Sequence, residues 1–353
     1  MTVSNPIRLG ADSKLASPSF DDLLLPVFGG EVLMRYNEAI VATNMVRRRN
    51  ITSGNTARFP RLGGISAERH SVGSKLLGLD SERTEIVITL DERPLVSHFR
   101  TDDIDEMLSH FESRSEMSAQ SGEALAEAQE RFTMRLLINA ATTAAPPNTN
   151  FPGGGQLQTG APATDSDLPA TPTGAYGEAG VGAILNWMDD VAVAWDINRI
   201  PFPVRNVMIV PTAWHEMKNF GSPRSATDLN NGRTPLFQAA DGTYGSNANP
   251  GQFITQMPDF NTPLQYNGFN IWRSNLTPFG QDLSQDDEVK YQGDFSLNRA
   301  LAWQQDAIGI LTLMDVMTES ERDVSRQDFL FVTKMLSGGG TLRPEAADVL
   351  NDA

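Results

Sequence analysis

The sequence contains no cysteine and only four histidines among its 353 residues. The absence of cysteine excludes disulfide bonds, thiolate metal sites and cysteine nucleophiles. No two of the histidines have a spacing that would place them on one face as metal ligands. We interpret each as an ordinary surface or core residue: His70, His98, His110 and His215. Stabilisation of the fold must therefore come from packing or from contacts with other subunits.

Familiar signatures of catalysis are also missing. The chain has no Gly-Lys dipeptide and so no phosphate-binding P-loop, no GxSxG, no HExxH, and no GxGxxG after a predicted strand. The acidic cluster Asp102, Asp103, Asp105 and Glu106 fits a helix start, where the helix dipole favours anions. Residues 285–288, Gln-Asp-Asp-Glu, are interpreted as a solvated loop, with divalent-ion binding as the alternative. These features argue against an enzyme.

Long apolar runs and lysine are scarce. No stretch approaches the ~18 apolar residues of a membrane span, and the N-terminus lacks a signal-peptide core, so we expect a soluble protein made in a cytoplasm. The net charge is −16; residues 1–101 hold 13 basic and 11 acidic residues, which leaves 15 basic and 33 acidic ones in the rest. So acidic a surface repels nucleic acid. Of the 28 basic residues 23 are Arg, which suits ion pairs at interfaces, although a GC-rich genome produces the same bias.

Two segments predict a projecting two-stranded ribbon. ERTEIVITLDERPL, residues 82–95, is expected to form one strand, and TARFPRLGG, residues 56–64, offers the return strand. Pro60 excludes a central position in a sheet. Alternation places these residues on the two packed faces: Ile86, Ile88 and Leu90, and Ala57, Phe59 and Arg61. Neither strand has the apolar run of a core strand, which raises the question of what the ribbon packs against.

Residues 101–141 predict one long helix. Thr101 or Asp102 can cap it, and Arg131 and Arg135 lie near its end, where the dipole favours cations. At 1.5 Å per residue it would be about 60 Å long, longer than the roughly 50 Å width of a compact chain of this size. Two shorter helices broken near Gly122 are the alternative. One stripe keeps a single face and is small in its middle: Ile104, Leu108, Phe111, Ser115, Ser118, Gly122, Leu125, Phe132 and Leu136.

The remaining segments predict a mixed α/β arrangement. A helix is expected over 31–46 after the Gly29-Gly30 break, and the Pro/Gly-rich residues 142–180 predict a long exposed loop or insertion. A helix over 181–200, a strand over 206–210 and a helix from about Thr212 follow. Residues 221–250 again predict a loop. We further expect a hairpin at Asn267-Gly268, strands within 297–323, a last strand, a turn at 338–340 and a helical turn near Pro344.

The order of these parts resembles the major capsid proteins of tailed double-stranded-DNA phages with the HK-97-type (Johnson) fold. Short motifs make the chain similar to the head protein of short-tailed, T-seven-like autographiviruses: VFGGEVL (27–33), ITSGNTARFPRLGG (51–64), VITLD (87–91), RSE (114–116), QSGEALA (120–126) and GGGTLRPEAA (338–347). The likeness is strong over 1–141 and 291–353 and weak over 142–290. It implies an α+β capsid fold.

The resemblance implies five parts: a mobile N-terminal arm (1–50), an E-loop (51–101), a P-domain spine helix with the Pro/Gly-rich loop (102–180), an A-domain (181–317), and a P-domain strand and tail (318–353). It also implies that the ribbon packs against the neighbouring subunit, not its own core. Candidate inter-subunit contacts are Arg47, Arg48, Arg49, Arg58, Arg61, Glu82, Arg83, Glu85, Asp91, Glu92 and Arg93. Candidate hinge residues are Gly63, Gly64, Gly73 and Gly78. A cross-link through Lys75, as in some relatives of the fold, has no supporting residues.

The function implied is a structural one, with no cofactor, no metal and no membrane. Pentamers and hexamers of identical subunits would close into an icosahedral head around double-stranded DNA, bound without sequence specificity. A scaffolding protein and a portal would assist assembly in the bacterial cytoplasm, and a decoration protein is a further candidate partner. The alternatives are an encapsulin-like compartment shell and a carboxylate-based hydrolase.

Overall fold

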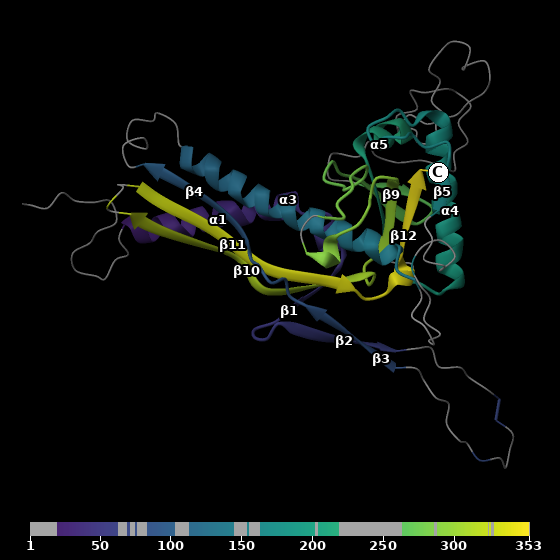
Figure 1. Ribbon diagram of the computed structural model, residues 1–353, viewed down its shortest axis with the longest axis horizontal. Helices are drawn as coiled ribbons and strands as arrows, with labels where there is room; N and C mark the ends of the chain where they lie inside the picture. The colour runs from purple at the N-terminus through teal and green to yellow at the C-terminus, as the bar shows by residue number, and fades with distance from the viewer. Residues whose placement is uncertain are drawn as a thin grey trace, which may run out of the picture.

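The computed structural model describes residues 20–62, 69–70, 75, 83–102, 113–144, 154, 163–201, 204–218, 263–285, 288–323, 325 and 328–352. The described elements form two regions and a ribbon (Figure 1). The elongated region combines helices α1 (Phe20–Ala39) and α3 (Ser113–Ala141) with a four-stranded sheet. The compact region contains a six-stranded sheet with helices α4 (Gly177–Ile197) and α5 (Pro211–Lys218). No helix within these ranges is long and apolar enough to cross a membrane.

The compact region holds most of the hydrophobic core. Its strand order is β5-β12-β9-β6-β8-β7, and β6 (Arg205–Ile209) and β9 (Asn298–Gln304) are buried at every position. The other strands are β5 (Ala163–Asp165), β7 (Leu264–Tyr266), β8 (Phe269–Arg273) and β12 (Ala347–Asp352). The predicted strand at 206–210 and the helix near 212 are confirmed. β5 corrects the expectation that 142–180 contains no element, since this short strand pairs with β12.

The hairpin predicted at Asn267-Gly268 joins β7 and β8. Both residues have positive φ angles, 43° and 82°, which a type I′ turn requires. The local turn signal was sufficient here because the two strands are adjacent along the chain.

The elongated sheet has the order β1-β10-β11-β4. Its long central strands, β10 (Ile308–Asp323) and β11 (Asp328–Thr341), are antiparallel, and β1 (Arg47–Asn50) and β4 (Leu95–Asp102) form the edges. The turn expected at 338–340 is wrong, because these glycines lie inside β11. A Cβ atom on Gly338 would come within 2.6 Å of the Leu90 Cα atom, so close packing explains the glycine. The turn near Pro344 is confirmed as the 3-10 helix η4 (Pro344–Ala346).

The long helix begins later than predicted. Thr101 and Asp102 lie in β4, where they pair with Phe329 and Asp328, so neither caps a helix. Phe99 explains the difference, since its ring stacks 5.1 Å from Phe331 and holds this segment in the sheet. Asp103, Asp105 and Glu106 lie outside the described residues. α3 is about 44 Å long, and it continues through position 122, so the broken-helix alternative is wrong.

The N-terminal segment packs on α3. α1 covers Phe20–Ala39, not 31–46, and Gly29-Gly30 lie inside it; the 3-10 helix η1 (Ala42–Met45) and β1 follow. A Cβ atom on Gly122 would lie 2.5 Å from the Val32 carbonyl oxygen, so the small residues of the α3 stripe admit the α1 backbone. This part of the N-terminal segment therefore contacts α3, and the role of residues 1–50 as an arm stays a prediction.

The ribbon consists of β2 (Thr56–Leu62) paired antiparallel with β3 (Arg83–Thr89). The expectation of one strand over 82–95 is wrong, since β3 ends at Thr89 and β4 starts at Leu95 in another sheet. The predicted alternation is confirmed, and this face packs on its own chain, whereas a contact of the ribbon with a neighbouring subunit stays a prediction. Ala57, Phe59 and Ile88 are buried against Leu311 and Leu342 of the same chain, because the alternation supplies one apolar face.

Candidate assembly surface at the ribbon

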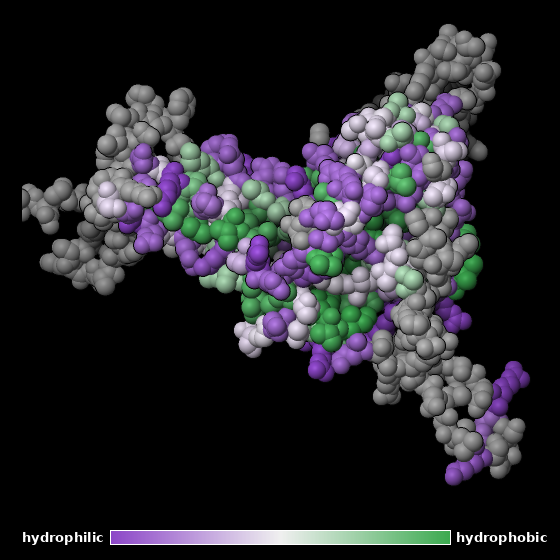
Figure 2. Space-filling view, viewed as in Figure 1, coloured by the Kyte–Doolittle hydropathy of each residue, from purple (hydrophilic) through white to green (hydrophobic). Residues whose placement is uncertain are grey.

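The outer face of the ribbon is exposed and mixed in character. The Arg58 guanidinium lies 3.3 Å from the Glu85 carboxylate, and their side chains are 71% and 51% exposed. Val87, opposite Arg58, is 52% exposed. Figure 2 shows a hydrophobic area near the base of the ribbon, bordered by hydrophilic residues. This face offers another chain an apolar contact together with charges of both signs.

Strand β1 adds a basic edge next to the ribbon. All four of its residues are exposed, and the Arg47 and Arg49 guanidinium carbons lie 6.0 and 5.5 Å from the Phe59 ring centroid. Arg49 donates a hydrogen bond to the Arg58 carbonyl (3.0 Å), and Arg48 donates one to the Asn44 side chain (3.4 Å). Arg47 also lies 3.6 Å from Asp306. The predicted basic run is thus gathered at the ribbon base.

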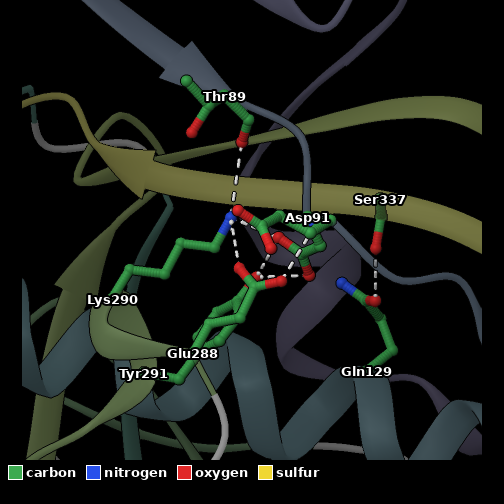
Figure 3. A network of polar contacts seen from close by, with 8 residues as sticks. Thr89, Asp91, Gln129, Glu288, Lys290, Tyr291 and Ser337 are labelled. Atoms are coloured by element: carbon green, nitrogen blue, oxygen red, sulfur yellow. Dashed lines mark hydrogen bonds and ion pairs between the residues drawn. The ribbon is translucent and has the colours of Figure 1, made fainter.

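A polar network holds the start of the β3–β4 connection against the compact region (Figure 3). Lys290, in the 3-10 helix η3 (Val289–Tyr291), forms an ion pair with Asp91 and lies 3.5 Å from Glu288. The Tyr291 hydroxyl donates to the Asp91 carboxylate at 2.9 Å, and Lys290 also donates to the Thr89 carbonyl (3.4 Å). This network ties the ribbon to η3.

Burial changes the acid–base properties of this network. Desolvation raises the pKa of Asp91, although the Lys290 ammonium and the Tyr291 hydroxyl oppose the shift. Burial and the adjacent Asp91 carboxylate raise the pKa of Tyr291, which keeps its hydroxyl protonated as a donor. Glu288, whose side chain is 35% exposed, accepts a hydrogen bond from the Glu92 backbone N–H (2.9 Å), a contact that the expected solvated loop did not include.

A second ionic contact fastens β2. Arg61 donates to Glu345 of η4 at 2.7 Å, and both side chains are at most 9% exposed. Arg343 donates to the other oxygen of the same carboxylate at 2.9 Å. Burial lowers the pKa of Arg61, and the Glu345 carboxylate opposes that shift. The carboxylate therefore joins the ribbon to the segment leading into β12.

The remaining predicted residues are placed as follows. Arg93 is exposed between β3 and β4, and Lys75 is exposed. The backbone of Arg83 belongs to β3. Glu82, Asp286, Asp287, His110 and the candidate hinge glycines at 63, 64, 73 and 78 lie outside the described residues. The inter-subunit role of Glu82, Arg83 and Arg93 and the hinge role of these glycines stay predictions.

Sequence reasoning missed three carboxylates that fasten segments in this part of the molecule; Glu130 and Glu345 are buried and Glu288 is partly exposed. Glu345 and Glu288 bind partners in the ribbon segment, and Glu130 of α3 accepts hydrogen bonds from the backbone N–H groups of Val41, Ala42 and Thr43 at 2.6 to 3.0 Å. Acidic residues inside predicted helices or loops show no periodicity that marks them as buried. Only the tertiary contacts reveal them.

These contacts fasten segments of the chain together. Among the residues that the structure describes, no three His, Asp or Glu side chains gather so that they could hold a metal ion. The charged groups instead form ion pairs that connect the ribbon segment to η3 and η4.

Comparison with known proteins identifies the class. Residues 58–189 match the family model Gp10A-like, described as a major capsid protein. The chain is 28% identical over 333 residues to the major capsid protein of Escherichia phage T7, covering 92% of this chain and 90% of that protein. The capsid structure of cyanophage P-SCSP1u matches with a TM-score of 0.65 and 27% identity, covering 89% and 88% of the two chains. The mature capsid of bacteriophage PhiM1 shares the fold, with a TM-score of 0.63 at 14% identity over 89% and 87% of the chains.

The mixed helix-and-sheet fold and the sequence matches define a structural protein of virus shells, not an enzyme. Within that class the chain is a bacteriophage major capsid protein, a subunit that assembles with its own copies into the capsid of the virion. The relatives are capsid proteins of phages like T7, which agrees with the motifs seen in the sequence.

Proposed function

We propose that the chain has the HK-97-type fold and that its segments form the parts of that fold expected from the sequence. Residues 1–50 act as the N-arm, 51–101 as the E-loop and 181–317 as the A-domain, while 102–180 and 318–353 form the P-domain. The observation that carries this proposal is the β2–β3 ribbon, which lies at the edge of the molecule (Figure 1) and keeps a charged outer face with Arg58 and Glu85. An exposed two-stranded ribbon is a liability in a monomer, and a neighbouring copy that covers it would remove that liability.

In this proposal the ribbon and β1 carry the contacts between copies. The inner face of the ribbon is used within its own chain, so the outer face with Arg58 and Glu85, and the basic edge of β1, remain for the neighbour. Charge pairs at such a contact specify orientation more than affinity. Identical subunits in head-to-tail contact close into rings, here pentamers and hexamers of an icosahedral head.

The finer partners follow from the same proposal. A scaffolding protein and a portal assist assembly in the host cytoplasm, a decoration protein is a further candidate, and the shell encloses double-stranded DNA without reading its sequence. The net charge of −16 supports a container that does not adhere to its contents. The glycines at 63, 64, 73 and 78 would let the ribbon tip bend.

Electron microscopy of the purified protein, with and without its scaffolding partner, tests the proposal. We expect closed shells, tubes or five- and six-membered rings for the wild type. The double variant Arg47→Glu/Arg49→Glu and deletion of residues 63–80 are each expected to remove these assemblies while the subunit stays folded. Arg131→Glu, an exposed substitution on α3, is the matched control. Shells of normal yield from both ribbon-side variants would refute the proposed contacts.

A further inference from the structure

The elongated sheet has one face that is covered by helices. Phe331 of β11 packs in one cluster with Phe28 of α1, and Met335 of β11 packs in another with Leu125 of α3. Residues at this spacing along a strand point to the same side of the sheet. The alternate residues of β11, and the residues of β4 and β10 that pair with them, therefore point away from both helices.

The opposite face presents three columns of residues, one from each strand. Residues of β11 form the middle column, and their paired residues in β4 and β10 form the two outer columns. Side chains of directly paired residues lie on the same side of a sheet. We call this surface the open face; from β4 to β10 its rows are Val96, Lys334 and Met317; His98, Val332 and Glu319; and Arg100, Leu330 and Glu321.

The two outer columns are exposed and carry opposite charges, whereas the middle column is partly buried. The β4 column carries Arg100, and the β10 column carries Glu319 and Glu321. Arg100 lies 2.9 Å from Asp328 of its own chain, yet its side chain is 42% exposed, and a guanidinium has enough N–H donors for a second carboxylate. Glu319 lies 2.6 Å from Lys334 and is 56% exposed. Both groups are therefore accessible to a charge on another molecule.

The pattern of the open face is complementary to itself. If two open faces pack with a two-fold axis parallel to β11, the β4 column of each copy lies opposite the β10 column of the other. Arg100 of one copy then faces Glu321 of the other, and each such contact is made twice. In the same way Val96, 48% exposed, faces Met317, 47% exposed. A two-fold axis across the strands would instead place the acidic column opposite its own copy, so the charges favour the first arrangement.

We propose that the open face is an isologous contact between two copies of this chain, in which Arg100 of each copy pairs with Glu321 of the other. A second copy is the occupant because the chain assembles with its own copies and because its own charge pattern is the complement that the face requires. The contacts proposed at the ribbon and β1 are head-to-tail, so rings need a further contact to join into a shell. The open face shares no residue with the ribbon or β1, and this contact stands whether or not those are correct.

Native mass spectrometry of the full chain tests the contact by charge reversal. Arg47→Glu/Arg49→Glu serves as the parent, so that contacts at β1 do not mask a dimer. We expect the parent to form dimers. Arg100→Glu or Glu321→Arg, each added to the parent, should raise the dimer dissociation constant at least about tenfold, because each homodimer then holds two like-charge pairs. An equimolar mixture of the two variants should form heterodimers within about threefold of the parent affinity, because both pairs are then matched.

A matched pair on α3 controls for overall charge. Glu127→Arg and Arg131→Glu each change an exposed ion pair outside the open face, so each should dimerise as the parent does, and their mixture should show no preference for heterodimers. Met317→Asp, which removes an apolar contact of the open face, should also weaken the dimer about tenfold.

Three results would each overturn the proposal: a monomeric parent, charge variants that dimerise like the parent, or a mixture of Arg100→Glu and Glu321→Arg without heterodimers. Rings that persist in the parent would count against the contacts proposed at the ribbon and β1 alone. The preference of the two charge variants for mixed pairs is measurable in such rings as well, so the two proposals are tested separately.

Discussion

The compact region and the ribbon are held in the molecule by different forces. In the compact region every residue of β9 and β6 is buried, and its cohesion comes from apolar side chains packed on all sides. The ribbon has one apolar face, and its ends are fastened by ion pairs, Asp91 with Lys290 and Arg61 with Glu345. Apolar packing fixes one arrangement, whereas ion pairs can be exchanged for pairs with another chain. The difference suits a subunit with a fixed body and an arm that engages a neighbour.

Helix α3 shows a similar contrast between apolar contacts at one end and polar contacts at the other. Its C-terminal part, including Leu137 and Ile138, enters the main core. Its N-terminal part meets α1 through polar contacts, where Ser118 donates to the Glu31 carboxylate at 2.5 Å. The comparison therefore predicts that stability concentrates at one end of the helix.

The largest loss of stability is expected from Trp303→Ala in β9. The Trp303 side chain is 0% exposed, and removing a buried aromatic residue leaves a cavity. We expect the free energy of unfolding to fall by about 3–5 kcal/mol, measured by urea denaturation of the unassembled subunit. Val87→Ala on the outer face of the ribbon is the control, with a change below about 0.5 kcal/mol. Equal losses in both variants would erase the distinction between the regions.

Glu130→Ala tests the hydrogen bonds between the α3 carboxylate and the backbone of the N-terminal segment. It removes a buried acceptor and leaves the N–H groups of Val41, Ala42 and Thr43 without it, so we expect a loss of about 3 kcal/mol in unfolding free energy. Glu127→Ala, at an exposed site one turn away, serves as control and should change the value by less than about 0.5 kcal/mol. A loss for Glu130→Ala no larger than that of the control would show that these hydrogen bonds contribute nothing to the free energy of unfolding.

Asp348 predicts a pH dependence that originates in the compact region. Burial raises its pKa to about 7, and the Trp187 indole N–H donates to it at 3.1 Å. Because the folded pKa lies above the ordinary value of 3.8, the favourable contribution is complete below about pH 4 and is lost as the pH rises to 7. We expect unfolding free energy to fall by roughly 1.4 kcal/mol per pH unit across that window. Asp348→Asn should flatten this slope; an unchanged slope would assign it to other groups.

The smallest change in the free energy of unfolding is expected when the ion pairs that hold the ribbon are broken. Lys290→Ala and Arg61→Ala each break a partly or fully buried ion pair, and we expect losses of about 1–2 kcal/mol. Their local effect should be larger: hydrogen exchange of β2 and β3 amides should accelerate while that of β9 stays unchanged. Arg58→Ala, which breaks the exposed pair with Glu85, should leave both observables unaltered. Faster hydrogen exchange of β9 amides in Lys290→Ala or Arg61→Ala would mean that the ribbon and the core unfold together.

Much of the fold was predictable wherever the signal was local. The hairpin at Asn267-Gly268 and the alternating faces of the ribbon follow from turn chemistry and period-two patterning. Glycine misled the prediction at 29–30 and 338–340, because these residues lie inside a helix and a strand instead of a turn. Close packing accounts for Gly29 and Gly338, whereas a Cβ atom on Gly30 would meet nothing within 4 Å. A glycine's local preference is the same in both settings, so only the neighbouring segment decides its role.

The candidate site was predictable in part. The charges of the ribbon and of β1 stand out in the sequence, but their partners Lys290 and Glu345 lie about 200 and 284 positions from Asp91 and Arg61. No periodicity connects residues so far apart. Thr101 and Asp102 were assigned to a helix because local capping chemistry suits them, yet pairing of β4 with β11 outweighed it.

The sequence by itself determined the periodic elements, the absence of thiol chemistry, the acidic charge and the family motifs, because each depends on residue type and short spacing. The tertiary structure alone decided that the ribbon base packs on its own chain, that Glu130 is buried as an acceptor, and that two tryptophans meet the end of α1 in a groove. Those outcomes depend on which distant segments come into contact. Contact over such separations is set by the packing of the whole chain, which local patterns do not encode.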